Sequence, residues 1–453
     1  MTRPETRTAT ESAVSDGPLL SVSGAELRVP LVNGEEARYI NLDYAASAPA
    51  LDVVVDHITE LLPLCSSVHR GAGYPSQVST SVYENARRVV GEFVGARPDD
   101  TVIFTRNTTD SLNLLASVVP GDCVALDIEH HANLLPWTHG AGRVLRSGDS
   151  LDETLEIVEA ELAARPAAVL AVTGASNVTG EVVPLRRLAT IAHRYGTRIA
   201  VDGAQLVPHR RVAIAALGID YLAFSGHKVY APFGAGVLVG RPDWLDSGAP
   251  HLRGGGAVSS VTLESSTWRR GAARHEAGSP NVVGVAALAR AVQELAALDS
   301  AVWREHEDRL RRRLIDGLSA FPEVSVHRVF DDSIETVGVV SFSVDQVDSR
   351  LLAIMFSAEW GIGVRDGQFC AQPLISRLGI DGSVVRASLG LGSRASDIDH
   401  LLTALRSFLR HGPRGRYEHV NGDWVAVGDA RPRPGWAPVL GVGVGYSGCA
   451  SAS

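Results

Sequence analysis

Short apolar runs alternate with amphipathic stretches between residues 100 and 240. The runs at 167–173, 199–201 and 221–224 are apolar at successive positions and do not alternate with polar residues. Runs of this kind are typical of strands buried on both faces of a parallel sheet. Stretches of helical length separate them, so residues 104–235 predict a parallel sheet with right-handed crossovers, covered by helices.

The same pattern divides the chain into two folded domains and two ends. Residues 39–298 hold the sheet and form the larger domain, and the glycine-flanked apolar run near 235–240 suggests its last strand, antiparallel to the others. Residues 299–412 mix helical and strand patterns and predict a smaller α+β C-terminal domain. Residues 1–38 are expected to be a disordered or irregular lead-in. Residues 413–453 are rich in glycine and proline and are expected to be an extension outside the fold.

Composition and charge exclude several classes of function. The chain of 453 residues has a net charge of -9 and no basic runs, which argues against nucleic acid as a partner. No apolar run approaches the length that crosses a bilayer, and the N-terminus lacks a hydrophobic signal core. We therefore expect a cytoplasmic protein without a membrane partner. The cysteines form no CxxC pair, and no His/Cys/Asp cluster completes a metal shell, so no metal site is expected.

Lys228 is the only lysine in the chain. Arginine can replace lysine as a surface charge, but it cannot act as an amine nucleophile at neutral pH. Lys228 and Asp202 each follow a predicted parallel strand, at the sheet edge where sites form. Proteins hold pyridoxal phosphate (PLP) through a lysine Schiff base and an acidic or basic partner for its pyridine nitrogen. The alternative is a lysine left on the surface without a chemical role.

The strings VDGAQ at 201–205 and SGHK at 225–228 resemble the signature of fold-type I PLP enzymes, in the class V aminotransferase and cysteine desulfurase branch. The resemblance implies an α/β fold with a mostly parallel seven-stranded sheet covered by helices in the large domain, and a smaller α+β C-terminal domain. It also implies PLP as the cofactor, a small amino acid as the substrate, and a homodimer with shared active sites.

The resemblance further implies a set of cofactor-binding residues. Thr108 and Thr109 open a helix directly after a strand, where free N–H groups favour an anion, and would bind the phosphate; helix capping is the alternative. His130 in EHHAN would stack on the pyridine ring and relay protons, with a buried core histidine as the alternative. The implied set is Thr108, Thr109, His130, Asn177, Asp202, Gln205, Ser225, His227 and Lys228, with Ser279 reaching the phosphate of the other subunit.

Cys370 lies in GIGVRDGQFCAQPL, on a loop after a predicted strand, where neighbouring basic groups make a thiolate a strong nucleophile. The loop resembles that of group II cysteine desulfurases and selenocysteine lyases, Arg-x-Gly-His-His-Cys-Ala-x-Pro-Leu. Gln368 and Phe369 replace the two histidines. The resemblance assigns the substrate to Ala46, Asn177, Arg365 and Arg386, of which Arg386 would bind the α-carboxylate. A loop cysteine without a catalytic role is the alternative.

These residues lead to one hypothesis and two alternatives. The hypothesis is a PLP-dependent cysteine desulfurase-like lyase that removes sulfur, or selenium, from L-cysteine or a related amino acid. Lys228, Cys370 and His130 would be catalytic, a Cys370 persulfide and alanine would form, and a sulfur-acceptor protein would be a further partner. The first alternative is a class V aminotransferase, epimerase or other PLP lyase in which Cys370 accepts no sulfur. The second is a partner-binding protein that keeps PLP as a structural element.

Overall fold

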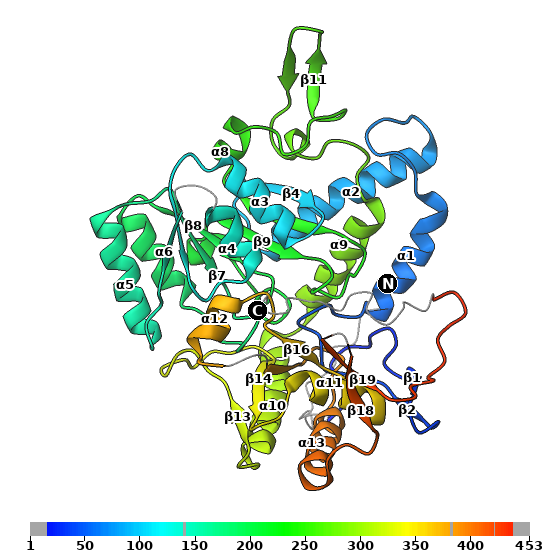
Figure 1. The fold of residues 1–453 in the computed structure, drawn as a ribbon. Coiled ribbons are helices and arrows are strands. Elements are labelled where there is room, and N and C mark those ends of the chain that lie inside the picture. The colour runs from blue at the N-terminus through cyan, green and yellow to red at the C-terminus, as the bar shows by residue number, and fades with distance from the viewer. Residues whose placement is uncertain (1–15, 139–141, 381–383, 421, 438–453) are drawn as a thin grey trace, which may run out of the picture.

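The computed structural model describes residues 16–138, 142–380, 384–420 and 422–437 (Figure 1). The expected disorder at residues 1–15 and 438–453 lies outside these ranges. None of the described helices is both long and apolar enough to cross a bilayer.

A seven-stranded sheet forms the centre of the larger domain (Figure 1). Its strands follow the order β4 (Thr101–Thr105), β10 (Gly236–Gly240), β9 (Tyr221–Ser225), β8 (Arg198–Asp202), β7 (Val169–Thr173), β5 (Cys123–Leu126) and β6 (Arg143–Leu145). From β9 to β6 all neighbours are parallel, and β10 runs antiparallel to both β4 and β9. The mostly parallel sheet and its antiparallel strand confirm the prediction.

Helices cover both faces of this sheet because apolar side chains point to both. On β7, Leu170 and Val172 belong to one apolar cluster, and Val169 and Ala171 belong to another. The first cluster packs against α1 (Asp52–Leu61), α2 (Tyr74–Phe93), α5 (Leu151–Ala164), α6 (Leu185–Arg194) and α9 (Val282–Ala297). The second packs against α3 (Thr108–Val118), α4 (His131–Thr138) and α8 (Pro242–Ser247). A strand covered on both sides needs no polar face, which explains the continuous apolar runs.

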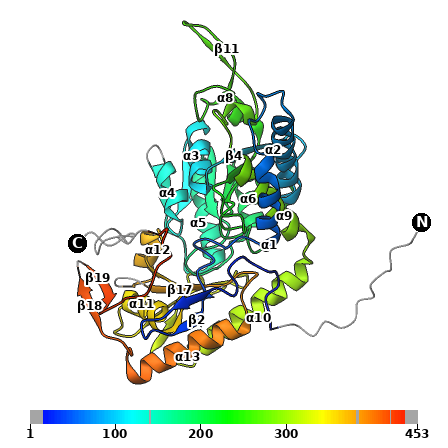
Figure 2. The ribbon, with the colours of Figure 1, turned by 90° about the vertical axis from the view of Figure 1, so that its right-hand side faces the viewer.

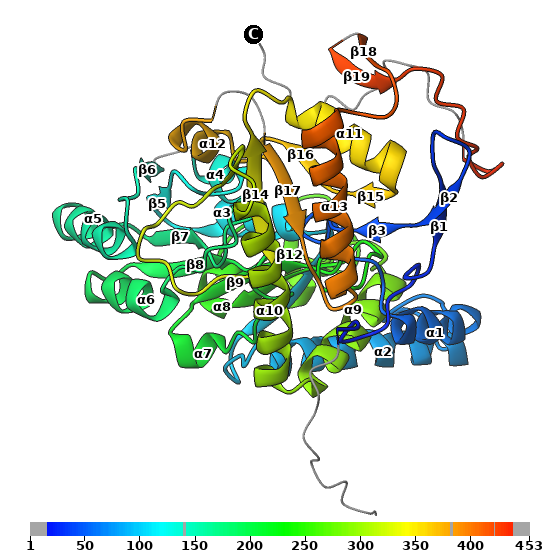
Figure 3. The ribbon, with the colours of Figure 1, turned by 90° about the horizontal axis from the view of Figure 1, so that it is seen from below.

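The smaller domain packs helices against a four-stranded antiparallel sheet. The sheet order is β13 (Val324–Val326), β14 (Val339–Val344), β17 (Val384–Ser388) and β16 (Arg365–Gly367). Its apolar core includes residues of α10 (Ser300–Ser319), α11 (Ser349–Trp360) and α13 (Ala395–His411), and α10 and α13 lie side by side (Figure 3). Strand β3 (Ile40–Asn41) pairs in parallel with β15 (Ile362–Gly363), so an early segment of the chain is built into this domain.

The remaining elements are short. They are β1 (Arg28–Pro30), β2 (Glu36–Arg38), the 3-10 helices Leu62–Leu64 and Ala272–Arg274, α7 (Ile214–Leu217), β11 (Val258–Val261), β12 (Ser266–Trp268), α12 (Gln372–Arg377), β18 (Tyr417–Val420) and β19 (Asp423–Ala426). Strands β11 and β12 form a hairpin that projects from the larger domain (Figure 1).

Both described ends of the chain are more regular than the sequence predicts. Residues 28–38 carry the hairpin β1/β2, and β18/β19 form a second hairpin beside α11 (Figure 2). Glu359 of α11 is buried and accepts hydrogen bonds from the backbone N–H groups of Arg414 and Gly415 and from the Tyr417 hydroxyl. The structure therefore differs from the expected irregular extension over this segment. Contacts of this kind join residues far apart in the chain and leave no local pattern in the sequence.

Candidate active site

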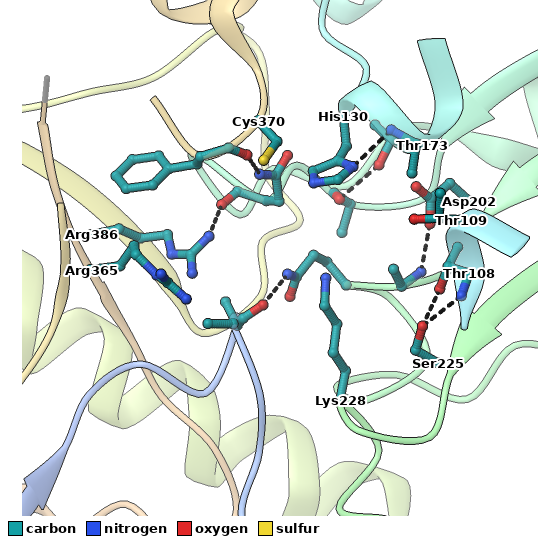
Figure 4. Close-up of a pocket in the computed structure, with 18 of the residues that line it drawn as sticks. Thr108, Thr109, His130, Thr173, Asp202, Ser225, Lys228, Arg365, Cys370 and Arg386 are labelled. Carbon is teal, nitrogen blue, oxygen red and sulfur yellow. Dashed lines mark hydrogen bonds between the residues drawn. The ribbon is translucent and has the colours of Figure 1, made fainter. Parts of the chain in front are cut away.

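A pocket of about 370 Å³ lies at the carboxyl ends of β7, β8 and β9, where loops of the smaller domain meet the larger one (Figure 4). This is the sheet edge where ligands bind in open α/β folds. The structure brings nearly all the predicted site residues to this pocket: Ala46, Thr108, Thr109, His130, Asn177, Asp202, Gln205, Ser225, His227, Lys228, Arg365, Cys370 and Arg386. Ser279 is exposed and does not line the pocket. That Ser279 reaches the phosphate of a second subunit stays a prediction.

Lys228 extends into the middle of the pocket from the turn that follows β9 (Figure 4). Burial lowers the pKa of Lys228 to about 8, while the negative charges of Asp202 and Cys370 oppose that shift. Asp202 ends β8, is 4% exposed, and accepts a hydrogen bond of 2.9 Å from the N–H of Ala204. Burial raises the pKa of Asp202, and the N–H of Ala204 and the charge of Lys228 work against it. The pocket thus holds a nucleophilic amine and a carboxylate that gains from a cationic neighbour.

The first turn of α3 forms an anion cradle between β4 and β9. Asn107 caps this helix, its side chain accepting from the N–H of Asp110. The Thr108 N–H donates to Ser225 Oγ at 2.7 Å, and the two hydroxyls lie 2.6 Å apart. Gly236 of β10 abuts Asn107 so closely that a Cβ there would lie 2.5 Å from its Cα. The cradle combines hydroxyls with the N–H groups of a helix start, which suits a phosphate.

His130 lies on the turn between β5 and α4, and its ring faces the pocket (Figure 4). Burial, helped by the charge of Lys228, lowers the pKa of His130 to about 3, so the imidazole is neutral. Its Nδ1 lies 3.0 Å from the N–H of Ala132 and accepts from it. The ring proton therefore resides on Nε2, which makes that atom a donor.

Gln205 carries a buried acceptor that has no partner among the described residues. Its Nε2 donates to the Ala45 carbonyl at 2.8 Å, which fixes the amide, while Oε1 is buried and makes no hydrogen bond. A buried polar atom of this kind is costly unless a ligand satisfies it. A pyridine ring with a hydroxyl substituent would supply a donor here. The residues present therefore fit PLP.

Arg386 of β17 forms the opposite wall and is 4% exposed. Its Nη1 donates to the Asn177 carbonyl at 2.9 Å, and its Nη2 donates to Asp43 Oδ1 at 3.1 Å. Its Nε is buried and makes no hydrogen bond to any described residue. Arg365 pairs with the other oxygen of Asp43 at 3.3 Å. Asp43 thus orients two arginines, a role that the sequence interpretation missed because its partners are far away in the chain.

Cys370 lies on the loop between β16 and α12, beside His130 (Figure 4). Gly367, Phe369 and Cys370 all have left-handed backbone, with φ of 112°, 53° and 52°. Two hydrogen bonds hold this strained turn: the His131 N–H donates to the Cys370 carbonyl at 2.8 Å, and Asn177 Nδ2 donates to the Phe369 carbonyl at 2.8 Å. The turn thereby places Cys370 in the pocket that also holds Lys228 and Arg386.

Glu129 is a buried residue next to the pocket that the sequence interpretation passed over. Its two oxygens accept from the N–H of Thr173 at 3.0 Å and from Asn133 Nδ2 at 2.6 Å. Burial raises the pKa of Glu129 to about 8. It ties the end of β7 to the helix that follows His130. Glu129 lies three positions after the apolar strand β5, between Ile128 and His130, and an acidic residue this close to a buried strand end was the signal that could have found it.

The comparison with known proteins agrees with this geometry. The family model described as Aminotransferase class-V matches residues 40–401. The chain belongs to this family. It is 35% identical over 409 residues to a cysteine desulfurase of Haloferax volcanii, covering 86% of this chain and 95% of the relative. Cysteine desulfurases of Klebsiella pneumoniae and Dickeya dadantii are equally similar, at 35% identity over 392 and 397 residues.

Solved structures of class V members show the same fold. The cysteine desulfurase CsdA of Escherichia coli aligns with a TM-score of 0.72 and 33% identity, over 82% of this chain and 95% of that one. The cysteine desulfurase of Thermococcus onnurineus aligns with a TM-score of 0.75 and 30% identity, over 86% and 99%. The chain is therefore a PLP-dependent enzyme of the cysteine desulfurase group, as its sequence predicts.

Proposed function

We propose that this chain binds PLP through Lys228 and removes sulfur from L-cysteine, passing it to Cys370 and releasing alanine. The observation that supports this most is the placement of Cys370 in one pocket with the sole lysine and a buried arginine. A sulfur acceptor, an amine that holds the cofactor and a carboxylate receptor are the three groups that the reaction requires.

The pocket residues divide into those that hold the cofactor and those that hold the substrate. Thr108, Thr109 and Ser225 would hold the phosphate, Asp202 the ring nitrogen, and Gln205 the ring hydroxyl. When bound, PLP draws electrons away from the α-carbon of an amino acid. Asp202 would sustain that effect by keeping the ring nitrogen protonated.

The remaining groups act on the substrate. Arg386 would offer to the α-carboxylate its Nε, which has no partner within the described part of the chain, and Arg365 would add a second positive charge. Lys228 would be the base that moves a proton at the α-carbon, because its pKa of about 8 leaves part of the amine neutral at pH 7. The Cys370 thiolate attacks the substrate sulfur: an S–S bond forms, the Cβ–S bond breaks, and Cβ takes a proton. Cysteine and one enzyme thiol give alanine and one persulfide.

The wider setting is part of the same proposal. We expect a homodimer in which Ser279 of each subunit completes the other site, a sulfur-acceptor protein that relieves the persulfide, and a location in the cytoplasm. A class V aminotransferase, epimerase or other lyase is the second candidate. It is favoured by Phe369, whose ring stands where the related loop has a histidine that could serve as a base.

Release of sulfide and alanine from L-cysteine by the purified enzyme in the presence of a reductant tests the reaction. We expect Cys370→Ser to abolish sulfide release while PLP stays bound. Cys65→Ser, at a partly buried cysteine outside the pocket, should leave release unchanged. Equal sulfide release by the Cys370 variant would refute the proposal, and transamination of amino acids without sulfide release would favour the second candidate.

A further inference from the structure

The ring of Phe369 covers the guanidinium of Arg386. The ring centroid lies 4.9 Å from Arg386 Cζ, within the range of a cation–π contact. Phe369 is 9% exposed and Arg386 is 4% exposed, so little water reaches the pair. Both residues line the pocket, and Figure 4 labels Arg386 there.

The position of this ring is fixed from two directions. Its backbone adopts a left-handed conformation, and its carbonyl accepts from Asn177 Nδ2 at 2.8 Å. The carbonyl of Asn177 in turn accepts from Arg386 Nη1 at 2.9 Å. Asn177 therefore connects the loop that carries Phe369 and Cys370 to Arg386. A shift of this loop can alter the position of the guanidinium through this single residue.

One nitrogen of the Arg386 guanidinium is buried and makes no hydrogen bond to the described residues. Nη1 and Nη2 have partners, whereas Nε is buried without a hydrogen bond among the described residues. Because this N–H is buried, little solvent reaches it, and a carboxylate that binds there displaces little solvent. A charge-assisted hydrogen bond is also stronger where the local dielectric is low.

We propose that Phe369 is a positioning residue that keeps Arg386 dry and thereby increases the affinity of the pocket for α-carboxylates. The inference rests on the proposed function only in requiring an α-amino acid as ligand. The polar side chain that the related loop carries at this position would bring solvent to the guanidinium, so the phenyl ring sets this chain apart.

Two ligands that differ only in the carboxylate test this role. L-alanine carries the group and ethylamine lacks it, and both can exchange with the lysine on the cofactor, which the visible spectrum of the holoenzyme reports. We expect Phe369→Leu to weaken the binding of L-alanine about tenfold, between the effects of an exposed and of a desolvated cation–π contact, and to leave the binding of ethylamine unchanged. The KM for L-cysteine should rise by the same factor while kcat changes by less than about twofold.

Three further variants complete the design. Phe369→Tyr keeps the aromatic ring and should bind L-alanine as well as the unchanged protein does. Phe369→His should bind L-alanine about tenfold more weakly, like Phe369→Leu. Phe321→Leu removes a ring that lies 5.6 Å from Arg406 Cζ in the smaller domain, outside the pocket, and should change neither ligand.

Unchanged binding of L-alanine to the leucine variant, or equal weakening of both ligands, would overturn the role of Phe369. The spectral readout needs no sulfur release. Failure of the desulfurase reaction and failure of this inference are therefore separate results.

Discussion

The amine of Lys228 should react with PLP at a lower pH than the amine of an ordinary lysine does. Burial lowers its pKa from 10.5 to about 8, and only the neutral amine attacks an aldehyde. At pH 7 about one tenth of a group with this pKa is neutral, roughly 300-fold more than for an unperturbed lysine. The sign follows from burial, which disfavours the charged form.

The rate at which apoprotein takes up PLP, followed by absorbance between pH 6 and pH 10, measures this shift. We expect the rate to rise with pH, reach half its maximum near pH 8 and then level off. N-acetyl-lysine in the same buffers serves as the control, and its rate should still be rising at pH 10. Lys228→Arg should show no covalent uptake at any pH.

A rate for the protein that keeps rising to pH 10, in parallel with N-acetyl-lysine, would refute the reasoning. It would mean either that Lys228 lies in a solvated site or that the negative charges near it offset the effect of burial on its pKa.

Three further variants test other parts of the site and fold. Asp202→Asn keeps the hydrogen bond from Ala204 but removes the charge, so sulfide release should fall roughly a hundredfold while PLP is retained, as measured by turnover and absorbance. Arg386→Lys loses the planar fork for a carboxylate, and the KM for L-cysteine should rise by about tenfold or more. Glu359→Gln places an amide beside two backbone N–H groups, and the free energy of unfolding in urea should fall by about 1–3 kcal/mol.

For each of these three predictions, one result would contradict the reasoning. Full activity of Asp202→Asn would show that the carboxylate of Asp202 does not act on the ring nitrogen of PLP. An unchanged KM for L-cysteine in Arg386→Lys would show that another residue binds the α-carboxylate. For Glu359, the matched control is Glu418→Gln, an exposed carboxylate of the same hairpin, which should cost less than about 0.5 kcal/mol. Equal costs for the two would show that the hairpin does not depend on Glu359.

The larger domain and the cofactor side of the pocket could be predicted because their signals are local. Apolar runs without alternation form β7, β8 and β9. Asp202 ends β8 and Lys228 lies three residues after β9, and both reach the same sheet edge. A parallel sheet fixes which ends of its strands meet, so order along the chain was enough to bring these residues together.

The substrate side could be predicted only in part because it depends on contacts between distant segments. Asp43 pairs with Arg386, 343 positions further along the chain, and the sequence around Asp43 does not indicate this pairing. The cover that Phe369 forms over Arg386 depends on a left-handed turn and on Asn177 of the other domain. The hairpin after Gly412 likewise depends on Glu359, and its glycine-rich sequence alone suggested irregular structure.

The central claim is that the amine and the thiol of one pocket act together on cysteine. Its most direct test is mass spectrometry of the holoenzyme after brief exposure to L-cysteine without a reductant. We expect one added sulfur atom on the peptide that contains Cys370, and none on that peptide in Lys228→Ala. Alanine formed without sulfur on Cys370, or sulfur added equally in the variant that lacks the lysine, would contradict the account.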